Sequence, residues 1–216
     1  MNFLDLCKET SKLSGIQSTI LSVTDSSPGT QHDLVIKAVK NSWKSIQNFR
    51  SDFHFKRDVV SITVSSGVTE YTINDIFDNR ETFGSWIIQR FLVDYKPLSF
   101  VPYNAWVLQE PKATDKLITF SIKPQDSTVM IHPVNNVQVI EAHYHRGIQA
   151  LEGNADVPYL PPQFHMLIVY GAVMDISVSM GDMMVFNDKA RLYEQMMGQL
   201  MRSQVPARSV QRRPFV

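Results

Sequence analysis

Residues 156–172 read Asp-Val-Pro-Tyr-Leu-Pro-Pro-Gln-Phe-His-Met-Leu-Ile-Val-Tyr-Gly-Ala, a proline-rich segment that runs into an apolar one. Its three prolines fix their own φ angles and favour extended backbone in the residues that precede them. The stiff segment then leads into a helix, because proline is well tolerated at the first helical position. From residue 164 to residue 178 the helix is apolar almost all round, which predicts that it is buried inside a larger assembly of elements.

Further helices are predicted on both sides of this stretch. Apolar residues recur at helical spacing over residues 2–14 and again over residues 34–53, with a Ser/Thr-rich loop between them. Gly181 and Asp182 break the proline-opened helix, and a last helix follows until Pro206 ends it. Its apolar seam, spaced +4, +3, +4 and +3, consists of Phe186, Ala190, Tyr193, Met197 and Leu200.

The middle of the chain changes to the two-residue period of β-strands. Alternation of apolar and polar residues begins at about residue 55 and stops around His145. Residues 102–109 are expected to form a short helix or a loop. Strands are predicted at residues 60–64, 70–73, 87–95, 117–123, 129–132 and 137–145.

These patterns predict an α+β fold in which helices from both ends of the chain form one bundle. An antiparallel β-domain is expected as an insertion within that bundle. The predicted parts are a discontinuous helical bundle of residues 1–54 and 156–205, a β-rich domain of residues 55–155, and an extended basic C-terminal arm of residues 206–216.

Composition restricts the function classes. The chain has 21 basic and 21 acidic residues, so general nucleic-acid binding over the whole surface is disfavoured. Acidic residues interrupt the apolar start of the chain, and the apolar runs stop short of the roughly 20 residues that span a bilayer. We therefore expect a cytoplasmic product without a membrane anchor.

Cys7 cannot form an intramolecular disulfide, and a buried small hydrophobic residue is favoured over a reactive thiol.

The arm is unusual in its charge, because no acidic residue follows Glu194. Docking on a partner protein is the favoured interpretation of this basic segment. Contact with DNA phosphates and a merely solvated terminus are the alternatives. The candidate docking residues are Arg202, Arg208, Arg212, Arg213 and Phe215.

Three histidines are the candidates for chemistry. His143 and His145 alternate on one strand and share a face, as two zinc ligands would, but no third ligand stands at a telling spacing. His165, at the start of the apolar helix, is expected to satisfy backbone groups rather than to act as a general base. Glycine loops for phosphate, paired-cysteine metal motifs and nucleophile elbows are not found, so no cofactor, metal or catalytic residue is predicted. A small metal- or ligand-binding enzyme domain that uses the three histidines remains the alternative function.

The C-terminal third is rich in methionine, and adaptable core packing explains most of these residues. Met183 and Met184, beside Gly181, are the best candidates for a subunit contact. Phe186, Tyr193 and Met197 complete the predicted interface.

Several short motifs resemble those of head-to-tail adaptor proteins of tailed bacteriophages, over roughly residues 30–200. The Asp-x-Pro-x-x-Pro-x-x-Phe-His segment at residue 156 is the first of them. The others are Trp43-x-x-Ile46-Gln47, Phe53-x-Phe55-Lys56-Arg57, Val68-Thr69-Glu70-Tyr71-Thr72-Ile73, Ile131-His132-Pro133, Tyr144-His145-Arg146 and Tyr170-Gly171-Ala172.

This resemblance implies a structural virion protein without enzymatic activity, located in the neck of the particle and assembled in the host cytoplasm. Such proteins form rings, usually dodecamers, that join the portal protein to the tail tube or nozzle protein while double-stranded DNA passes through the centre. The β-domain then faces the tail and the C-terminal arm docks on the portal. Another neck or tail-completion protein of the same architecture is a further alternative.

Overall fold

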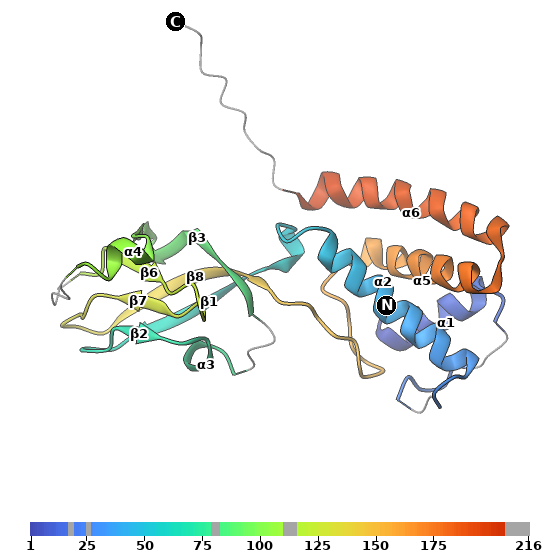
Figure 1. The fold of residues 1–216 in the computed structure, drawn as a ribbon, viewed down its shortest axis with the longest axis horizontal. Helices are drawn as coiled ribbons and strands as arrows, with labels where there is room; N and C mark the ends of the chain where they lie inside the picture. Colours follow the sequence, from blue (N-terminus) through green and yellow to red (C-terminus); the bar gives the residue numbers. More distant parts are fainter. Residues whose placement is uncertain (17–19, 25–26, 79–82, 110–115, 206–216) are drawn as a thin grey trace, which may run out of the picture. The chain divides into compact units, whose positions relative to one another are not determined.

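The computed structural model describes residues 1–16, 20–24, 27–78, 83–109 and 116–205 (Figure 1). The chain divides into two compact units. The helical unit comprises Met1–Phe55 and the described part of Gln149–Val216, and the β unit comprises Lys56–Ile148. Residues 149–155, which the sequence analysis assigned to the β-domain, lie with the helices because Leu151 is buried in the helical core. The predicted α+β class is confirmed.

The described residues of the helical unit form four α-helices (Figure 1). They are α1 (Phe3–Leu13), α2 (Gln31–Phe49), α5 (His165–Met180) and α6 (Met183–Gln204), and a 3-10 turn, Pro162–Phe164, leads into α5. Helix α5 packs against each of the other three. The predicted apolar helix is therefore the central element of its unit.

Local side-chain chemistry explains where these helices begin and end. Asn2 and Asp5 form a capping box at the start of α1, in which each side chain accepts a hydrogen bond from the backbone N–H of the other. Gly181 ends α5 with φ 72°, in the left-handed region that glycine adopts without strain. The Asp182 side chain then accepts from the Val185 N–H and caps α6.

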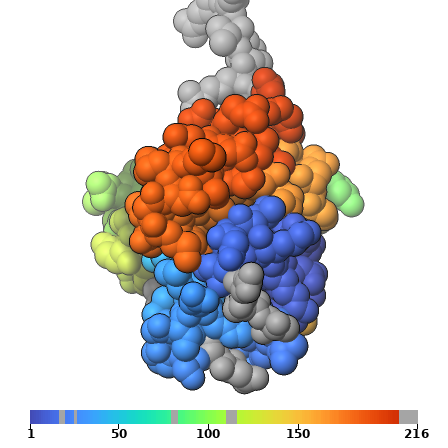
Figure 2. Space-filling model, turned by 90° about the vertical axis from the view of Figure 1, so that its right-hand side faces the viewer, coloured from blue at the N-terminus to red at the C-terminus, as the bar shows by residue number. Residues whose placement is uncertain are grey.

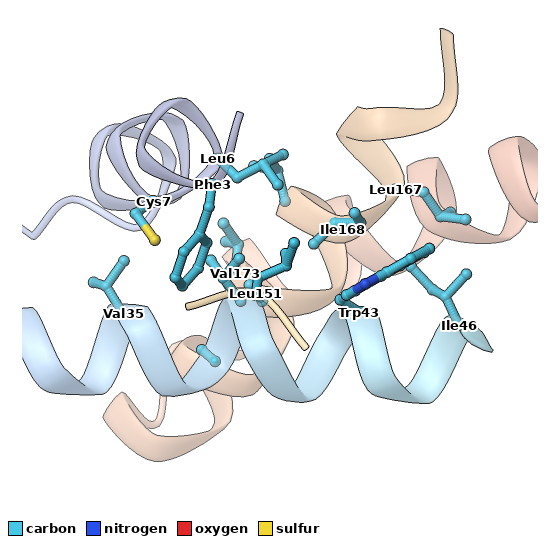
Figure 3. Close-up of a cluster of buried hydrophobic side chains, with 14 of the residues drawn as sticks. Phe3, Leu6, Cys7, Val35, Trp43, Ile46, Leu151, Leu167, Ile168 and Val173 are labelled. Atoms are coloured by element: carbon cyan, nitrogen blue, oxygen red, sulfur yellow. The ribbon is translucent and has the colours of Figure 1, made fainter. Parts of the chain in front are cut away.

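A single core fills the space between the helices (Figure 3). Trp43 of α2 and Phe3 of α1 are among its largest side chains, and Phe3 points from α1 toward α2. Leu167, Ile168 and Val173 of α5 are fully buried among them. Burial of these side chains supplies the main stabilisation of the bundle, at about 25 cal/mol for each Å² of apolar surface removed from water.

The segment Pro162–Met180 has a mean hydropathy of 1.2, and in length and composition it reaches the range of a membrane span. From the sequence, shorter apolar runs were expected. Since α5 packs against three other helices, its apolar composition is that of a helix in a protein core.

The β unit contains two four-stranded sheets, in the orders β1-β8-β3-β4 and β2-β7-β6-β5 (Figure 1). Among the described strands, all pairs are antiparallel except β5 with β6, which are parallel. The strands are β1 (Arg57–Val64), β2 (Glu70–Tyr71), β3 (Phe83–Val93), β4 (Lys96–Pro97), β5 (Ser99–Phe100), β6 (Thr119–Ile122), β7 (Val129–Ile131) and β8 (Gln138–Arg146). Two short helices, α3 (Ile73–Ile76) and α4 (Tyr103–Trp106), and a 3-10 turn at His54–Lys56 complete the described elements.

One apolar core joins the two sheets. Phe91 of β3 stacks on Phe120 of β6 with ring centroids 4.2 Å apart, and both side chains are fully buried. The inward residues of β8, such as Ile140 and Ala142, belong to the same cluster. The residues between them on β8 therefore lie on the opposite, outer face of the first sheet.

The strand predicted for residues 70–73 is shorter in the structure. It ends at Tyr71 because Thr72 caps α3 in a second capping box with Asp75. The strand predicted for residues 87–95 instead begins at Phe83, and its register against β8 shifts between Trp86 and Phe91. The extra residues between Trp86 and Phe91 form a bulge in β3.

Candidate functional site

His165 occupies a closed position in the helical unit. Its ring is 1% exposed, Nε2 donates to the Leu160 carbonyl at 2.8 Å, and Nδ1 accepts from the Met1 amino group at 2.8 Å. Burial lowers the pKa of this imidazole, against the effect of the Leu160 hydrogen bond. With both nitrogens engaged, the ring ties the start of α5 to the chain around it, as the sequence analysis expected of a residue that satisfies backbone groups.

His143 and His145 lie in the β unit, on the outer face of β8. Burial lowers the pKa of His143, and the nearby positive charges of Arg90 and Arg57 lower it further. Within the described ranges, no group of three or more His, Cys, Asp and Glu side chains could hold a metal ion. Arg90 and Arg57 thus lie close enough to His143 to act on it electrostatically, and Glu141 acts in the opposite direction.

Cys7 is fully buried in the helical core (Figure 3). Burial raises the pKa of its thiol to about 12, although Lys40 acts in the opposite direction. The thiol is therefore protonated at neutral pH and behaves as a small apolar side chain.

The segment before α5 is held by polar contacts that the sequence motif does not reveal by itself. The Asp156 carbonyl accepts from the Phe3 N–H at 2.7 Å, at the start of α1. The Asp156 carboxylate accepts from the backbone N–H groups of Glu152 and Gly153, and these bonds hold its pKa below the ordinary value. Gln149 continues this network with a hydrogen bond from its side chain to the Val157 carbonyl. The motif at residues 156–165 therefore positions helices.

An apolar surface remains uncovered where α5 meets α6. Its four side chains, here called the methionine corner, are Val178, Met180, Met183 and Met184, with exposed fractions of 58%, 52%, 55% and 84%. Helix α6, in red, lies on the surface of the helical unit (Figure 2). Exposed apolar side chains gathered within a short stretch of sequence, as here over residues 178–184, can mark an interaction surface.

The chain as a whole matches a family model, that of the SU10 adaptor protein, over residues 1–215. The chain belongs to the SU10 adaptor family. No curated protein matches it. The resemblance to phage adaptors is thereby confirmed, and the chain is a phage adaptor protein and a structural component of the virion.

The predicted contact residues of this adaptor differ in how far they reach the surface. Met183 and Met184 are exposed, whereas Met197 is 9% exposed and belongs to the helical core. Phe186 and Tyr193 are half-buried on α6, and Tyr193 packs against that core. Burial and the nearby Asp175 carboxylate raise the pKa of the Tyr193 hydroxyl. The helical seam thus faces largely inward, and the exposed contact residues lie at the beginning of α6.

A second surface of the adaptor, on α2, was not singled out in the sequence. Lys37, Lys40 and Lys44 are exposed at helical spacing along one side of this helix. Lys37 pairs with Asp33 at 2.8 Å, and the Lys40 ammonium lies 5.6 Å from the centroid of the Phe3 ring. Their three-to-four-residue spacing is a signal that the sequence already contained.

Arg202 is the one predicted arm residue that the structure describes. It is exposed near the end of α6 and lines an open hollow of about 460 Å³ with Gln163, Phe164, Gln199 and Ser203. Arg208, Arg212, Arg213 and Phe215 lie outside the described residues.

Proposed function

We propose that this adaptor forms a homo-oligomeric ring that joins the portal protein to the tail, with double-stranded DNA passing through its centre. Family membership supports the general role. The observation that carries the assembly proposal is the methionine corner, because a single subunit leaves four neighbouring apolar side chains in water. Burial of this surface in a complex removes the unfavourable free energy of exposing apolar side chains to water.

A ring requires two different surfaces on each subunit that fit one another. The methionine corner and the exposed face of α6, with the acidic residues Asp182 and Glu194, form the first surface. The lysine side of α2 is a second surface on another helix, and its ammonium groups could pair with Asp182 and Glu194 of a neighbouring subunit. Their complementarity favours head-to-tail association, and a dodecamer is the copy number that the family resemblance implies.

The C-terminal arm is the proposed contact with the portal. Arginine forms charge-assisted, two-pronged hydrogen bonds with carboxylates, so Arg208, Arg212 and Arg213 suit an acidic portal surface. Phe215 adds apolar area that is buried on docking. The β unit is then the part available to the tail tube or nozzle protein. The protein acts through shape and buried contacts, without turnover.

Light scattering tests this function directly. The mass of the purified protein is measured alone and after mixing with the portal protein of the same phage. A portal complex whose added mass equals a closed ring of adaptor subunits is expected. A protein that remains monomeric and does not bind the portal contradicts the proposal.

Introduction of a charge tests the methionine corner itself. Met184→Glu places a charge in an apolar contact, and the ring on the portal should be lost or weakened by at least tenfold in affinity. The matched control is Leu108→Glu, because Leu108 is 87% exposed but lies in the β unit. Equal effects of the two substitutions would show that the corner has no special role.

A further inference from the structure

The outer face of the first sheet carries a row of cationic side chains. Residues that lie opposite one another in an antiparallel pair share a face. Arg57 of β1 is paired with His145 of β8, and the same histidine is paired with Ser85 of β3. One step along the strands, Val59 is paired with His143. Arg57, His143 and His145 therefore lie on one face, opposite to the face that contains the buried residues of β8.

Arg90 adds the third strand to this row. It is exposed in the bulge of β3, and it acts electrostatically on His143 together with Arg57. The strand order β1-β8-β3 places the groups on three neighbouring strands. With about 4.8 Å between neighbouring strands, the row spans about 10 Å.

The arginines of the row are not used in ion pairs within the described part of the chain. Nε of Arg57 is buried and has no hydrogen-bond partner among the described residues. Glu141, on the same face of β8, is the one acidic group that acts on His143. Two arginines against one carboxylate leave this face positive, and His143 adds further positive charge when it is protonated.

This charge distribution indicates whether the face binds a cation or an anion. A metal ion needs neutral or anionic ligands, and the two guanidinium groups beside His143 repel it. A phosphate group, by contrast, accepts forked hydrogen bonds from arginine and is attracted by every cationic member of the row. The hydroxyls of Ser85 and Ser61, on the same face, are further donors to phosphate oxygens.

We propose that the row formed by Arg57, Arg90, His143 and His145 binds phosphate groups of a nucleic acid that runs across the three strands. Contacts of this kind are to the backbone and are independent of base sequence. The proposal goes beyond the adaptor function, because it assigns a phosphate contact to particular residues and does not depend on a ring or on the portal. It also differs from the interpretation that places DNA contacts in the C-terminal arm.

The salt dependence of DNA binding tests the assignment. The full chain is titrated with a fluorescent DNA duplex of about 30 base pairs, and the logarithm of the binding constant is plotted against the logarithm of the salt concentration. Each lost phosphate contact reduces the slope by about 0.9. Arg57→Gln and Arg90→Gln should therefore each reduce the slope by about 1 and weaken binding at low salt. Arg191→Gln is the matched control, because its side chain is 74% exposed on α6 in the helical unit.

Two further probes separate the sources of the anion. Inorganic phosphate and poly-glutamate are titrated against the same variants, with circular dichroism as the check of folding. We expect DNA binding to depend on Arg57 and Arg90. We expect inorganic phosphate and poly-glutamate to show no comparable binding that depends on these two arginines. Unchanged slopes in both variants would overturn the proposal. Binding of poly-glutamate that needs both arginines, without binding of DNA, would overturn it in favour of an acidic protein partner.

A separate readout uses the imidazole. Bound phosphate favours protonated His143, so its pKa, followed by nuclear magnetic resonance, should rise when the duplex is added. In consequence DNA affinity should increase as the pH falls through the pKa of His143. Arg57, Arg90, His145 and Glu141 are the charged or titratable neighbours that set its starting value. A His143 pKa that is the same with and without DNA would contradict the assignment even if the variants were to lose stability.

Discussion

Gln47 and Gln149 exchange two hydrogen bonds across 102 residues of sequence. Nε2 of Gln47 donates to the Gln149 carbonyl at 3.1 Å, and the Gln149 N–H donates to Oε1 of Gln47 at 2.7 Å. The Gln149 side chain in turn accepts from the Tyr159 N–H. One buried amide on α2 thus holds both the returning chain and the loop that leads into α5.

Gln47→Leu should destabilise the helical unit by about 2 kcal/mol or more, because the Gln149 backbone groups lose their partners while they remain partly buried. The measurement is urea unfolding followed by circular dichroism. Asn48→Leu is the control, since Asn48 is exposed at the next position of the same helix, and its effect should stay within about 0.5 kcal/mol. Equal stabilities of the two variants would contradict the role of this contact.

Gly171→Ala should destabilise the fold by about 1–3 kcal/mol through overpacking. A methyl group at this position of α5 would overlap Ser42 Oγ of α2 and lie 3.3 Å from the Tyr193 ring. Gly198→Ala is the matched control in α6, because nothing lies within 4 Å of the added methyl group. That substitution should instead stabilise the helix by about 0.5–1 kcal/mol.

Ser42→Ala should recover part of the stability that Gly171→Ala loses, because it removes the overlapping oxygen atom. Alone, it should be mildly destabilising, since Ser42 Oγ donates to the Ile168 carbonyl at 2.8 Å. A double-mutant cycle measures the coupling of the two positions. Additive effects would show that the methyl group is accommodated elsewhere.

The thiol of Cys7 should be inert in the folded protein. Its pKa of about 12 and its complete burial leave little thiolate at neutral pH. Alkylation by iodoacetamide at pH 7.5 should therefore proceed only after denaturant unfolds the helical unit. Rapid labelling of the native protein would show that α1 opens locally.

Asp58 should make stability depend on pH in the acid range. Burial raises the pKa of its carboxyl, but hydrogen bonds from Arg146 and the Val59 N–H outweigh this effect and keep the pKa below its ordinary value. Such a group stabilises the fold above its unfolded pKa of about 3.9, and this contribution is lost as the pH falls through the folded value. Asp58→Asn should thus be less stable than the parent at pH 7, and the difference should shrink below about pH 4. A difference that stays constant down to pH 2 would contradict this assignment.

Removal of residues 206–216 should leave the thermal unfolding midpoint unchanged and abolish binding to the portal. The described core of the helical unit ends with residues of α6, so the deletion removes none of its buried side chains. Calorimetry and co-sedimentation with the portal measure the two properties separately. Portal binding by the truncated protein at full strength would remove the arm from the proposed contact.

Periodicity in the sequence predicted the elements well, because it depends on which side of an element is buried. The change from helical to two-residue period near residue 55, and back again after His145, corresponds closely to the change from α2 to β1 and from β8 to α5. The same reasoning overlooked α3, although Thr72-x-x-Asp75 is a local capping signal. An apolar residue at Ile73, two positions after Tyr71, fits a continued strand as well as the start of a helix. The Thr72 cap makes this residue the start of α3.

Periodicity was less informative about what covers each surface. The seam of α6 includes Met197, which is buried in its own subunit, whereas the exposed Met184 precedes the seam. An apolar seam identifies the face of a helix that becomes buried, but it does not identify whether the same subunit or a partner covers that face. Contacts such as Gln47 with Gln149 were also not predictable from one sequence, because no local rule connects two amides so far apart.

The way the β unit is inserted in the chain has a consequence for the evolution of this adaptor. The chain passes from the helical unit to the β unit between residues 55 and 56 and returns between residues 148 and 149. The strands that carry these crossings are paired, Arg57 opposite His145, and such Cα atoms are about 5 Å apart. The β unit is therefore a cassette with adjoining ends. Recombination could replace residues 56–148 by another domain. The hydrogen bonds that join the four helices, including those between Gln47 and Gln149, would remain encoded outside the replaced segment.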